Sequence, residues 1–256
     1  MIFRGIIFNA ILVGLLAGLV LTIVQQLSVA PIIFAAEAYE VADEPAVVHE
    51  HEHEHGEAVI GHHHDEEAWA PEDGTERTLY SLLSNVLAGV GFSAVLMAVM
   101  TQLSAQGVAQ LNLLKGAIWG VGGFLALFVI PGLGLPPEIP GAEAAAIENR
   151  QTWWLLATVC SAMALLVLFY GPFVSKFIAP LLLALPFILG APHADAPMFS
   201  HPDPVALAAL NSLHEEFLWA SGAANLVFWL VLGVAAAWAV KRIVSASASV
   251  ALEARA

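Results

Sequence analysis

The sequence predicts an all-α, polytopic membrane protein that folds as a helical bundle. Hydrophobic residues make up 59% of its 256 residues, whereas soluble domains contain about 45–50% apolar residues. A soluble fold of this length could not bury so much apolar surface, so lipid is the expected solvent. The formal net charge is -14, and the charged residues cluster between the apolar runs. This acidity favours cations as partners and argues against nucleic acid.

Six apolar segments are predicted to span the membrane, within a single integral membrane domain that covers residues 1–256. They lie at approximately 5–29, 79–103, 113–130, 153–171, 177–190 and 217–240. The first is longer than the apolar region of a signal peptide, about 7–15 residues, which favours a retained span. The fifth is short and is interrupted by Pro180 and Pro186, so a bundle of five spans is the alternative.

Local signals predict where the helices begin and end. Pro31 is expected to end the first helix, and Asp73 opens a capping pattern ahead of the second span. Residues 131–141 are rich in Pro and Gly and cannot continue a helix. Ser212 and Glu215 fit a capping box ahead of the last span.

Small residues predict close packing between helices. Gly14 and Gly18 form a GxxxG pair, and Trp153 with Trp154 is expected in an aromatic belt at the membrane interface. One face of the second span combines small, polar and Met side chains, which indicates a packing face more readily than a path for an ion. That face comprises Ser81, Asn85, Gly89, Ser93 and Met100, with Met97 at its edge.

The basic residues predict the orientation of the six spans. If the N-terminus is cytoplasmic, only Arg77 and Arg150 lie outside, as the positive-inside rule favours. The basic residues inside are Arg4, Lys115, Lys176, Lys241, Arg242 and Arg255. All ten histidines then lie outside, together with every acidic residue except Glu253. We therefore expect cytoplasmic termini, a cytoplasmic tail at 241–256 and an extracytoplasmic loop at 41–78.

The loop at 41–78 is rich in histidine and acid, and is predicted to be mobile and to capture a metal ion. Alternate residues of an extended chain face the same way, so imidazoles would line one edge and glutamates the other. Imidazole binds divalent transition metals well, and histidines at this density are typical of metal-binding tracts. Affinity alone would favour Cu²⁺, Ni²⁺ or Zn²⁺ over Co²⁺. The histidines are His49, His51, His53, His55, His62, His63 and His64.

Enzymatic functions find little support in the chain. The segment His51-Glu52-His53-Glu54-His55 has the letters of the HExxH zinc-protease motif but lacks the helical pattern that this motif requires. No phosphate-binding loop and no GxSxG motif occur, so neither nucleotide hydrolysis nor a serine hydrolase is expected. Cys160 is the only cysteine, which excludes a disulfide framework. We predict a protein that is not an enzyme.

Polar residues near the helix ends are candidates for an inner metal site and a transport path. His214 and Glu216 are the predicted inner metal ligands, because both lie at the start of the last span. The predicted path residues are Gln25, Gln26, Glu37, Glu40 and Asn225. Hydrogen bonding between helices is an equally good explanation for the glutamines and for Asn225.

Several blocks of the sequence occur together in a recognisable order. They are Gly18-Leu19-Val20-Leu21-Thr22 with Gln25-Gln26, Ala36-Glu37-Ala38-Tyr39-Glu40, Leu135-Pro136-Pro137-Glu138-Ile139-Pro140-Gly141, Arg150-Gln151 with Trp153-Trp154, and Ala223-Ala224-Asn225-Leu226-Val227-Phe228-Trp229. With the His-rich loop, these blocks resemble the probable cobalt transporter subunit family, CbtA, over nearly the whole chain. The resemblance implies five spans, cobalt import for cobalamin biosynthesis, and a small single-span companion subunit, CbtB, with histidines of its own.

The residues and the resemblance together predict a bacterial inner-membrane subunit of a divalent-metal uptake transporter. Co²⁺ is the expected transported ion, with Ni²⁺ or Zn²⁺ as alternatives. Membrane lipid and a CbtB-like companion are the expected partners. The alternatives are a non-transporting metal chaperone or sensor in the membrane, and an intramembrane metalloenzyme.

Overall fold

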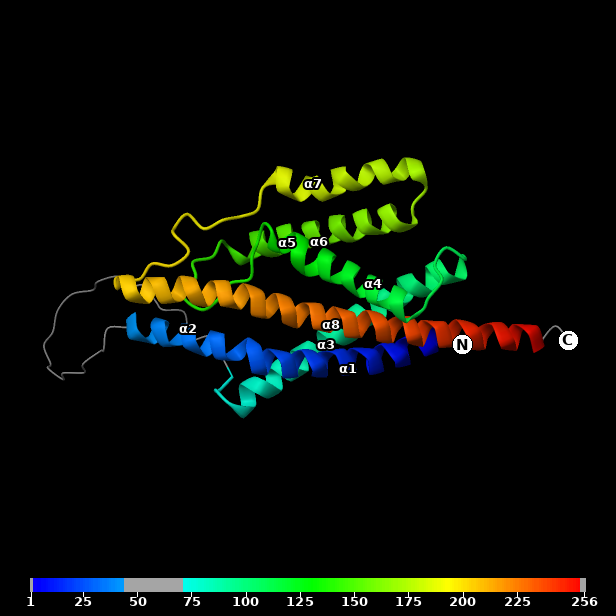
Figure 1. The fold of residues 1–256 in the computed structure, drawn as a ribbon, viewed down its shortest axis with the longest axis horizontal. Helices are drawn as coiled ribbons and strands as arrows, with labels where there is room; N and C mark the ends of the chain where they lie inside the picture. Colours follow the sequence, from blue (N-terminus) through cyan, green and yellow to red (C-terminus); the bar gives the residue numbers. More distant parts are fainter. Residues whose placement is uncertain (1, 44–70, 254–256) are drawn as a thin grey trace, which may run out of the picture.

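The computed structural model describes residues 2–43 and 71–253, and this part of the chain is helical apart from short connecting segments (Figure 1). Five helices are long and apolar enough to cross a membrane. No strand occurs among the described residues. The predicted all-α membrane bundle is therefore confirmed.

The elements follow one another with few long connections. In chain order they are α1 (Ile2–Ser28), α2 (Ala30–Asp43), α3 (Thr75–Ala105), α4 (Leu113–Phe124), the π-helix η1 (Leu125–Val129), α5 (Ile130–Gly132), α6 (Ile147–Tyr170), the 3₁₀ helix η2 (Phe173–Ile178), α7 (Ala179–Leu189) and α8 (Pro204–Glu253).

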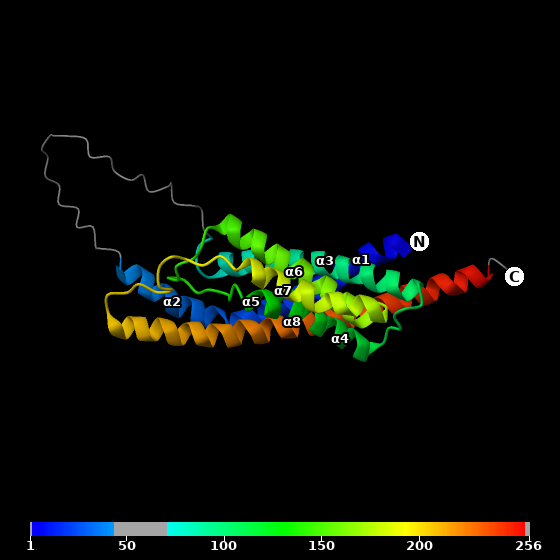
Figure 2. The ribbon, with the colours of Figure 1, turned by 90° about the horizontal axis from the view of Figure 1, so that it is seen from above.

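The bundle has an elongated shape, with α8 running along its whole length beside α1 and α2 (Figures 1 and 2). Helix α3 packs mainly on α1, and α4 packs mainly on α8. Helices α6 and α7 form an antiparallel hairpin at one side, and the N- and C-terminal ends lie at the same end of the bundle. The buried core combines small residues with Met97, Met100, Phe228 and Leu232.

The first helix ends just before Pro31, as expected, although a second helix begins almost at once. Helix α1 ends at Ser28, but α2 resumes at Ala30 and continues to Asp43. Pro31 lies in the first turn of α2. Backbone N–H groups in a first turn have no acceptor within the helix, so proline, which lacks this N–H, costs no hydrogen bond there. The N–H of Val29 donates to the carbonyl of Gln25 at 2.8 Å, so the chain continues with only a brief interruption.

The α1–α3 contact depends on the glycines of the predicted GxxxG pair. A Cβ atom on Gly14 would lie 2.3 Å from the backbone N of Val90, and one on Gly18 would lie 2.6 Å from the Cα of Val86. The backbones therefore meet directly, as this motif predicts. On the facing side of α3, the Ser93 hydroxyl donates to the carbonyl of Ala10 at 2.6 Å.

Most of the polar and Met face of the second span is buried against other helices. Gly89, Ser93, Met97 and Met100 are buried, which confirms packing for this part of the face, whereas Ser81 and Asn85 are half-buried. A similar close approach joins α4 to α8, where a Cβ on Gly120 would lie 2.3 Å from the carbonyl oxygen of Trp229.

The segment predicted as a fifth span lies in a continuous helical stretch, Phe173–Leu189, that is shorter than the five candidate spans. It packs on α6, and the Trp153 indole N–H donates to the carbonyl of Pro186 at 2.9 Å. Trp153 is thus buried between helices, whereas Trp154 is exposed. Of the two, only Trp154 is exposed as the predicted position at the membrane interface requires. Whether α7 crosses the membrane stays a prediction, as does the six-span topology.

The capping box predicted at Ser212 and Glu215 is wrong, because α8 begins at Pro204. The Asp203 carboxylate accepts a hydrogen bond from the N–H of Val205 at 2.9 Å and so caps the helix. Proline at the first helical position is favoured because its fixed φ suits the helix. The helix therefore starts well before the apolar run that marked the predicted span.

Candidate functional site

Polar and charged residues gather at the end of the bundle opposite the two termini, which we call the mouth. It comprises the end of α2, the start of α3, the segments 133–146 and 190–203, and the start of α8 (Figure 1). Two contacts join these parts. The N–H of Glu143 donates to the carbonyl of Met198 at 2.8 Å, and the rings of Tyr39 and His201 pack edge to face at 6.4 Å.

Several predicted site residues lie outside the described part of the chain. The seven histidines of 49–64 are among them, so the structure does not test their capture of a metal ion. The backbone of Glu40 belongs to α2, but its side chain also lies outside the described residues. The two elements on either side of this segment are α2, whose end belongs to the mouth, and α3, whose start belongs to it (Figure 1).

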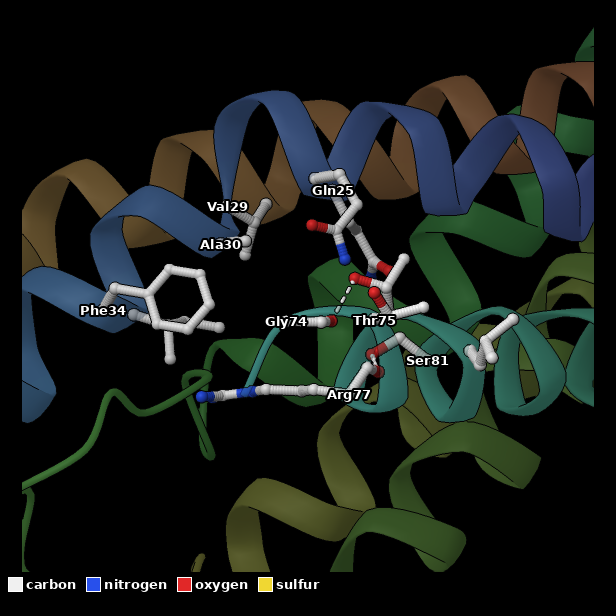
Figure 3. A pocket seen from close by; sticks show the side chains of 12 residues that line it. Gln25, Val29, Ala30, Phe34, Gly74, Thr75, Arg77 and Ser81 are labelled. Carbon is white, nitrogen blue, oxygen red and sulfur yellow. Dashed lines mark hydrogen bonds between the residues drawn. The ribbon is translucent and has the colours of Figure 1, made fainter. Parts of the chain in front are cut away.

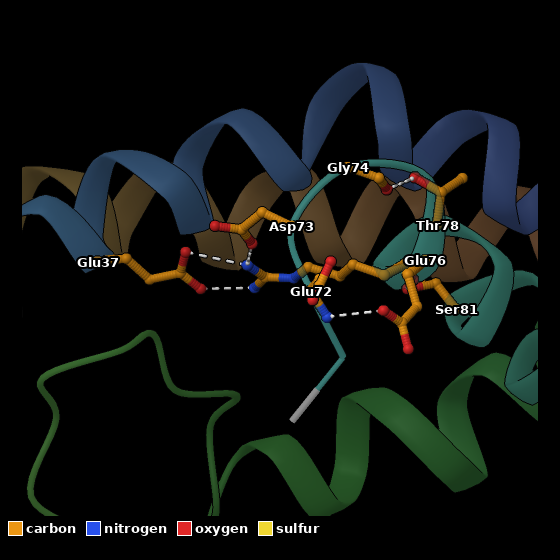
Figure 4. Close-up of polar contacts among 8 residues, drawn as sticks. Glu37, Glu72, Asp73, Gly74, Glu76, Thr78 and Ser81 are labelled. Carbon is orange, nitrogen blue, oxygen red and sulfur yellow. Dashed lines mark hydrogen bonds and ion pairs between the residues drawn. The ribbon is translucent and has the colours of Figure 1, made fainter. Parts of the chain in front are cut away.

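An arginine ties α2 to the start of α3 (Figure 4). Arg77 donates from Nη2 to Oε1 of Glu37 at 2.5 Å and from Nη1 to Oε2 at 3.0 Å. It also reaches Asp73 at 3.0 Å, and its guanidinium lies 4.8 Å from the centre of the Phe34 ring. Paired N–H donors in this fork geometry make the strongest carboxylate contacts. Glu37, a predicted path residue, therefore holds a guanidinium in this structure.

A pocket of about 610 Å³ lies beside this ion pair, between the α1–α2 junction and the start of α3 (Figure 3). The predicted path residues Gln25 and Gln26 both line it. Its other lining residues are Val29, Ala30, Ile33, Phe34, Gly74, Thr75, Arg77, Thr78, Leu79 and Ser81.

Asn85 joins α3 to α1 below this pocket. Its amide donates to Oε1 of Gln25 at 2.6 Å and to the hydroxyl of Thr22 at 3.0 Å. Hydrogen bonding between helices, one of the two explanations for Gln25, is thus present. Because Gln25 also lines the pocket, the structure leaves its predicted role in the path open.

Among the described residues that were predicted as metal ligands, His214 is the most buried. It is 9% exposed, and its Nδ1 has no hydrogen-bond partner among the described residues. The Phe199 ring packs against the imidazole edge to face at 6.1 Å. Glu216, the other predicted inner ligand, is exposed, so the structure does not bring these two side chains together.

The polar residues beyond His214 bond to their own helix. The Ser221 hydroxyl donates to the carbonyl of Leu218 at 3.3 Å, and the Asn225 amide donates to the carbonyl of Ser221 at 3.0 Å. These contacts satisfy the donors without a neighbouring helix. The predicted path role of Asn225 is neither supported nor opposed by them.

The sequence interpretation missed a second ion pair at the mouth, between Glu138 and Arg150. Nη2 of Arg150 donates to Oε2 of Glu138 at 2.5 Å, and both side chains are more than half buried. One signal could have revealed it, because Glu138 is the only acidic residue in the Pro-rich segment 131–141.

No group of three or more His, Cys, Asp or Glu side chains that could hold a metal ion occurs within residues 2–43 and 71–253. The described mouth offers two arginine–carboxylate pairs, a pocket whose lining includes the amides of Gln25 and Gln26, and the buried imidazole of His214.

The fold and the mouth define a polytopic helical membrane protein whose polar chemistry is concentrated at one end of the bundle. The model of the family "probable cobalt transporter subunit (CbtA)" matches residues 3–241, so the chain belongs to that family. Membership supports a role in membrane transport and confirms the resemblance found in the sequence. Comparison with curated proteins and with solved structures finds no match.

Proposed function

We propose that the chain is the membrane subunit of a divalent transition-metal uptake transporter and that Co²⁺ is the transported ion. The observation that carries the proposal is the family match over residues 3–241. The geometry agrees with it, because carboxylates and a buried imidazole, whose Nδ1 has no hydrogen-bond partner among the described residues, lie at one end of helices that can cross a membrane. Neither an enzyme nor a nucleotide-driven pump is proposed.

In this proposal the His-rich segment captures the ion and the mouth receives it. Seven imidazoles at 49–64 collect the cation outside the membrane. Glu37, Glu40, His214 and Glu216 are the proposed residues that receive it next. Gln25, Gln26 and Asn225 then supply part of the path, because amide oxygens can replace water around a cation.

The cellular setting follows from the same reasoning. The chain resides in the inner membrane of a bacterium with both termini in the cytoplasm, where the basic residues of α1, η2 and α8 face anionic lipid. The family name describes a subunit, which supports a partner. A small CbtB-like companion is the proposed partner, and cobalamin biosynthesis is the proposed destination of the metal. Ni²⁺ and Zn²⁺ are competing ions of the same ligand chemistry.

The decisive test is cobalt uptake into proteoliposomes that contain the intact chain with its companion subunit. Accumulation of labelled Co²⁺ is expected, and replacing the seven histidines of 49–64 with Gln is expected to reduce uptake at low metal concentration. His193→Gln, an exposed histidine outside the proposed set, is the matched control. Binding of Co²⁺ without accumulation would overturn the transport proposal and favour a metal chaperone.

A further inference from the structure

We propose that Arg77 exchanges with the arriving cation at the mouth: its guanidinium holds Glu37 and Asp73 before the ion binds, and returns to them as the ion leaves. This inference rests on the transport function proposed above, in which Glu37 receives the ion. It makes Arg77 a positioning residue for the two carboxylates, a role that the sequence pattern did not reveal.

Two carboxylates from different elements meet at the Arg77 guanidinium (Figure 4). Glu37 belongs to α2, and Asp73 lies just before α3. Oε2 of Glu37 and Oδ1 of Asp73 each lie 3.0 Å from the same atom, Nη1 of Arg77. The second nitrogen, Nη2, donates to Oε1 of Glu37 at 2.5 Å, so both oxygens of Glu37 hold the guanidinium. A single cation in the place of Nη1 would therefore lie within reach of both carboxylates.

The cluster is open to aqueous ions on one side. The Asp73 side chain is 78% exposed, whereas the side chains of Glu37 and Arg77 are 28% and 30% exposed. An ion from solution would thus meet Asp73 first and Glu37 second. The partial burial of Glu37 and Arg77 also reduces the screening by salt and water that weakens fully exposed ion pairs.

The pocket beside the cluster gives the guanidinium a place to move (Figure 3). Arg77 lines this cavity of about 610 Å³ together with Gln26 and Thr75. Their amide and hydroxyl oxygens can accept hydrogen bonds from a displaced guanidinium. The Phe34 ring also lines the pocket and lies 4.8 Å from the guanidinium, and the face of an aromatic ring attracts a cation. Rotation of the Arg77 side chain can therefore free the carboxylates while α3 stays in place.

The charges of the cluster allow a divalent ion to displace the guanidinium. Arg77 is permanently charged and neutralises only part of the charge of the two carboxylates. A divalent ion carries twice the charge of the guanidinium, so its Coulomb attraction to each carboxylate is twice as large at equal distance. The guanidinium remains attached to α3 and so stays at a high effective concentration beside the carboxylates. It can displace the ion in turn, which keeps the ion from being held too tightly to pass on.

The first test measures Co²⁺ binding by calorimetry, on the full chain with the seven histidines of 49–64 replaced by Gln and purified in detergent. Arg77→Gln should tighten binding about threefold or more, because it frees both carboxylates and removes a positive charge beside the ion. Arg77→Lys keeps a tethered cation and should show a smaller gain. The gain should disappear when Glu37→Gln is added to Arg77→Gln. Unchanged or weaker binding in Arg77→Gln would overturn the exchange.

The second test measures Co²⁺ uptake into proteoliposomes that contain the full chain with its companion subunit. Arg77→Gln should lower both the Co²⁺ concentration for half-maximal uptake and the maximal rate, because the ion binds more tightly and leaves more slowly. A lower maximal rate with an unchanged half-maximal concentration would overturn the exchange, since a merely structural role predicts this result. Glu72→Gln is the matched control, because it removes an exposed carboxylate next to Asp73 that does not belong to the cluster, and it should change neither quantity.

Thermal unfolding of each variant separates folding from exchange. A lower unfolding temperature with unchanged Co²⁺ affinity in Arg77→Gln would overturn the exchange and leave Arg77 a structural role only. Arg77→Met, which keeps the apolar stem of the side chain, replaces Arg77→Gln if the latter does not fold.

The failure of the exchange and the failure of the transport proposal give different results. If the unaltered chain accumulates Co²⁺ and Arg77→Gln has the same half-maximal concentration and maximal rate, the exchange is overturned and transport stands. If the unaltered chain accumulates none, transport is overturned, and the Co²⁺ affinities of the variants in detergent still decide the exchange.

Discussion

Replacing Gly14 with Ala tests whether direct backbone contact holds α1 against α3. The added Cβ would lie 2.3 Å from the backbone N of Val90. Ordinary van der Waals contact requires about 3.5–4.0 Å, so the helices would have to separate by more than 1 Å. Overpacking of this kind costs about 1–3 kcal/mol. The unfolding free energy should fall by this amount. The fall is partly offset, because Ala stabilises a helix by about 0.5–1 kcal/mol relative to Gly.

Gly91→Ala provides the matched control, because a Cβ at Gly91 would meet nothing within 4 Å. The control should unfold at the same denaturant concentration as the unaltered chain, or at a higher one. Unfolding in mixed micelles, followed by tryptophan fluorescence, measures both variants. Equal stability of Gly14→Ala and Gly91→Ala would refute the reasoning, since it would show that α1 and α3 are not in backbone contact at Gly14.

Three further predictions concern contacts near the mouth. Asn85→Leu removes the hydrogen bond to Gln25. The unfolding free energy should fall by about 0.5–1.5 kcal/mol, the range for polar contacts between membrane helices. An unchanged unfolding free energy would contradict the hydrogen bonds between α1 and α3. A double-mutant cycle with Glu37→Gln and Arg77→Gln should give a coupling energy of about 0.5–1 kcal/mol that falls with added salt, because the pair is partly exposed; a coupling of zero would mean that the pair is not formed. Asp203→Ala should cost about 1 kcal/mol and speed hydrogen exchange of the first turn of α8, whereas Asp203→Asn should cost less.

The fold class could be predicted from the sequence because it depends on composition and on long apolar runs. The GxxxG pair was equally accessible, since small residues at that spacing act through local geometry alone. Helix ends were harder. Ser212 and Glu215 matched the capping-box pattern, but the helix begins earlier, at Asp203 and Pro204. Its first turns, up to Ser212, pack against α2 and the segment 190–203, and the sequence alone does not reveal this packing.

The candidate site could be predicted only in part. His214 was accessible because a histidine at the start of an apolar span is unusual; the structure shows that it is buried, and its role as a metal ligand stays a prediction. Its contact with Phe199 was not accessible, because the two residues come from separate segments that only the fold brings together. The exposure of Glu216 also needed the structure, since adjacent helical positions differ in which face they occupy.

The length of α8 has a consequence for where an arriving cation first loses its water. The helix contains 50 residues, or about 75 Å, more than twice the about 30 Å hydrocarbon thickness of a bilayer. Trp238, with the Arg242 guanidinium 4.1 Å from its ring centre, suits one headgroup boundary, which the proposed orientation makes the inner one. Counting back about 20 residues from there puts the opposite hydrocarbon boundary near Leu218, about one turn from His214. Dehydration would then begin within the protein, above the acyl chains, where aqueous ions can still diffuse freely to the opening.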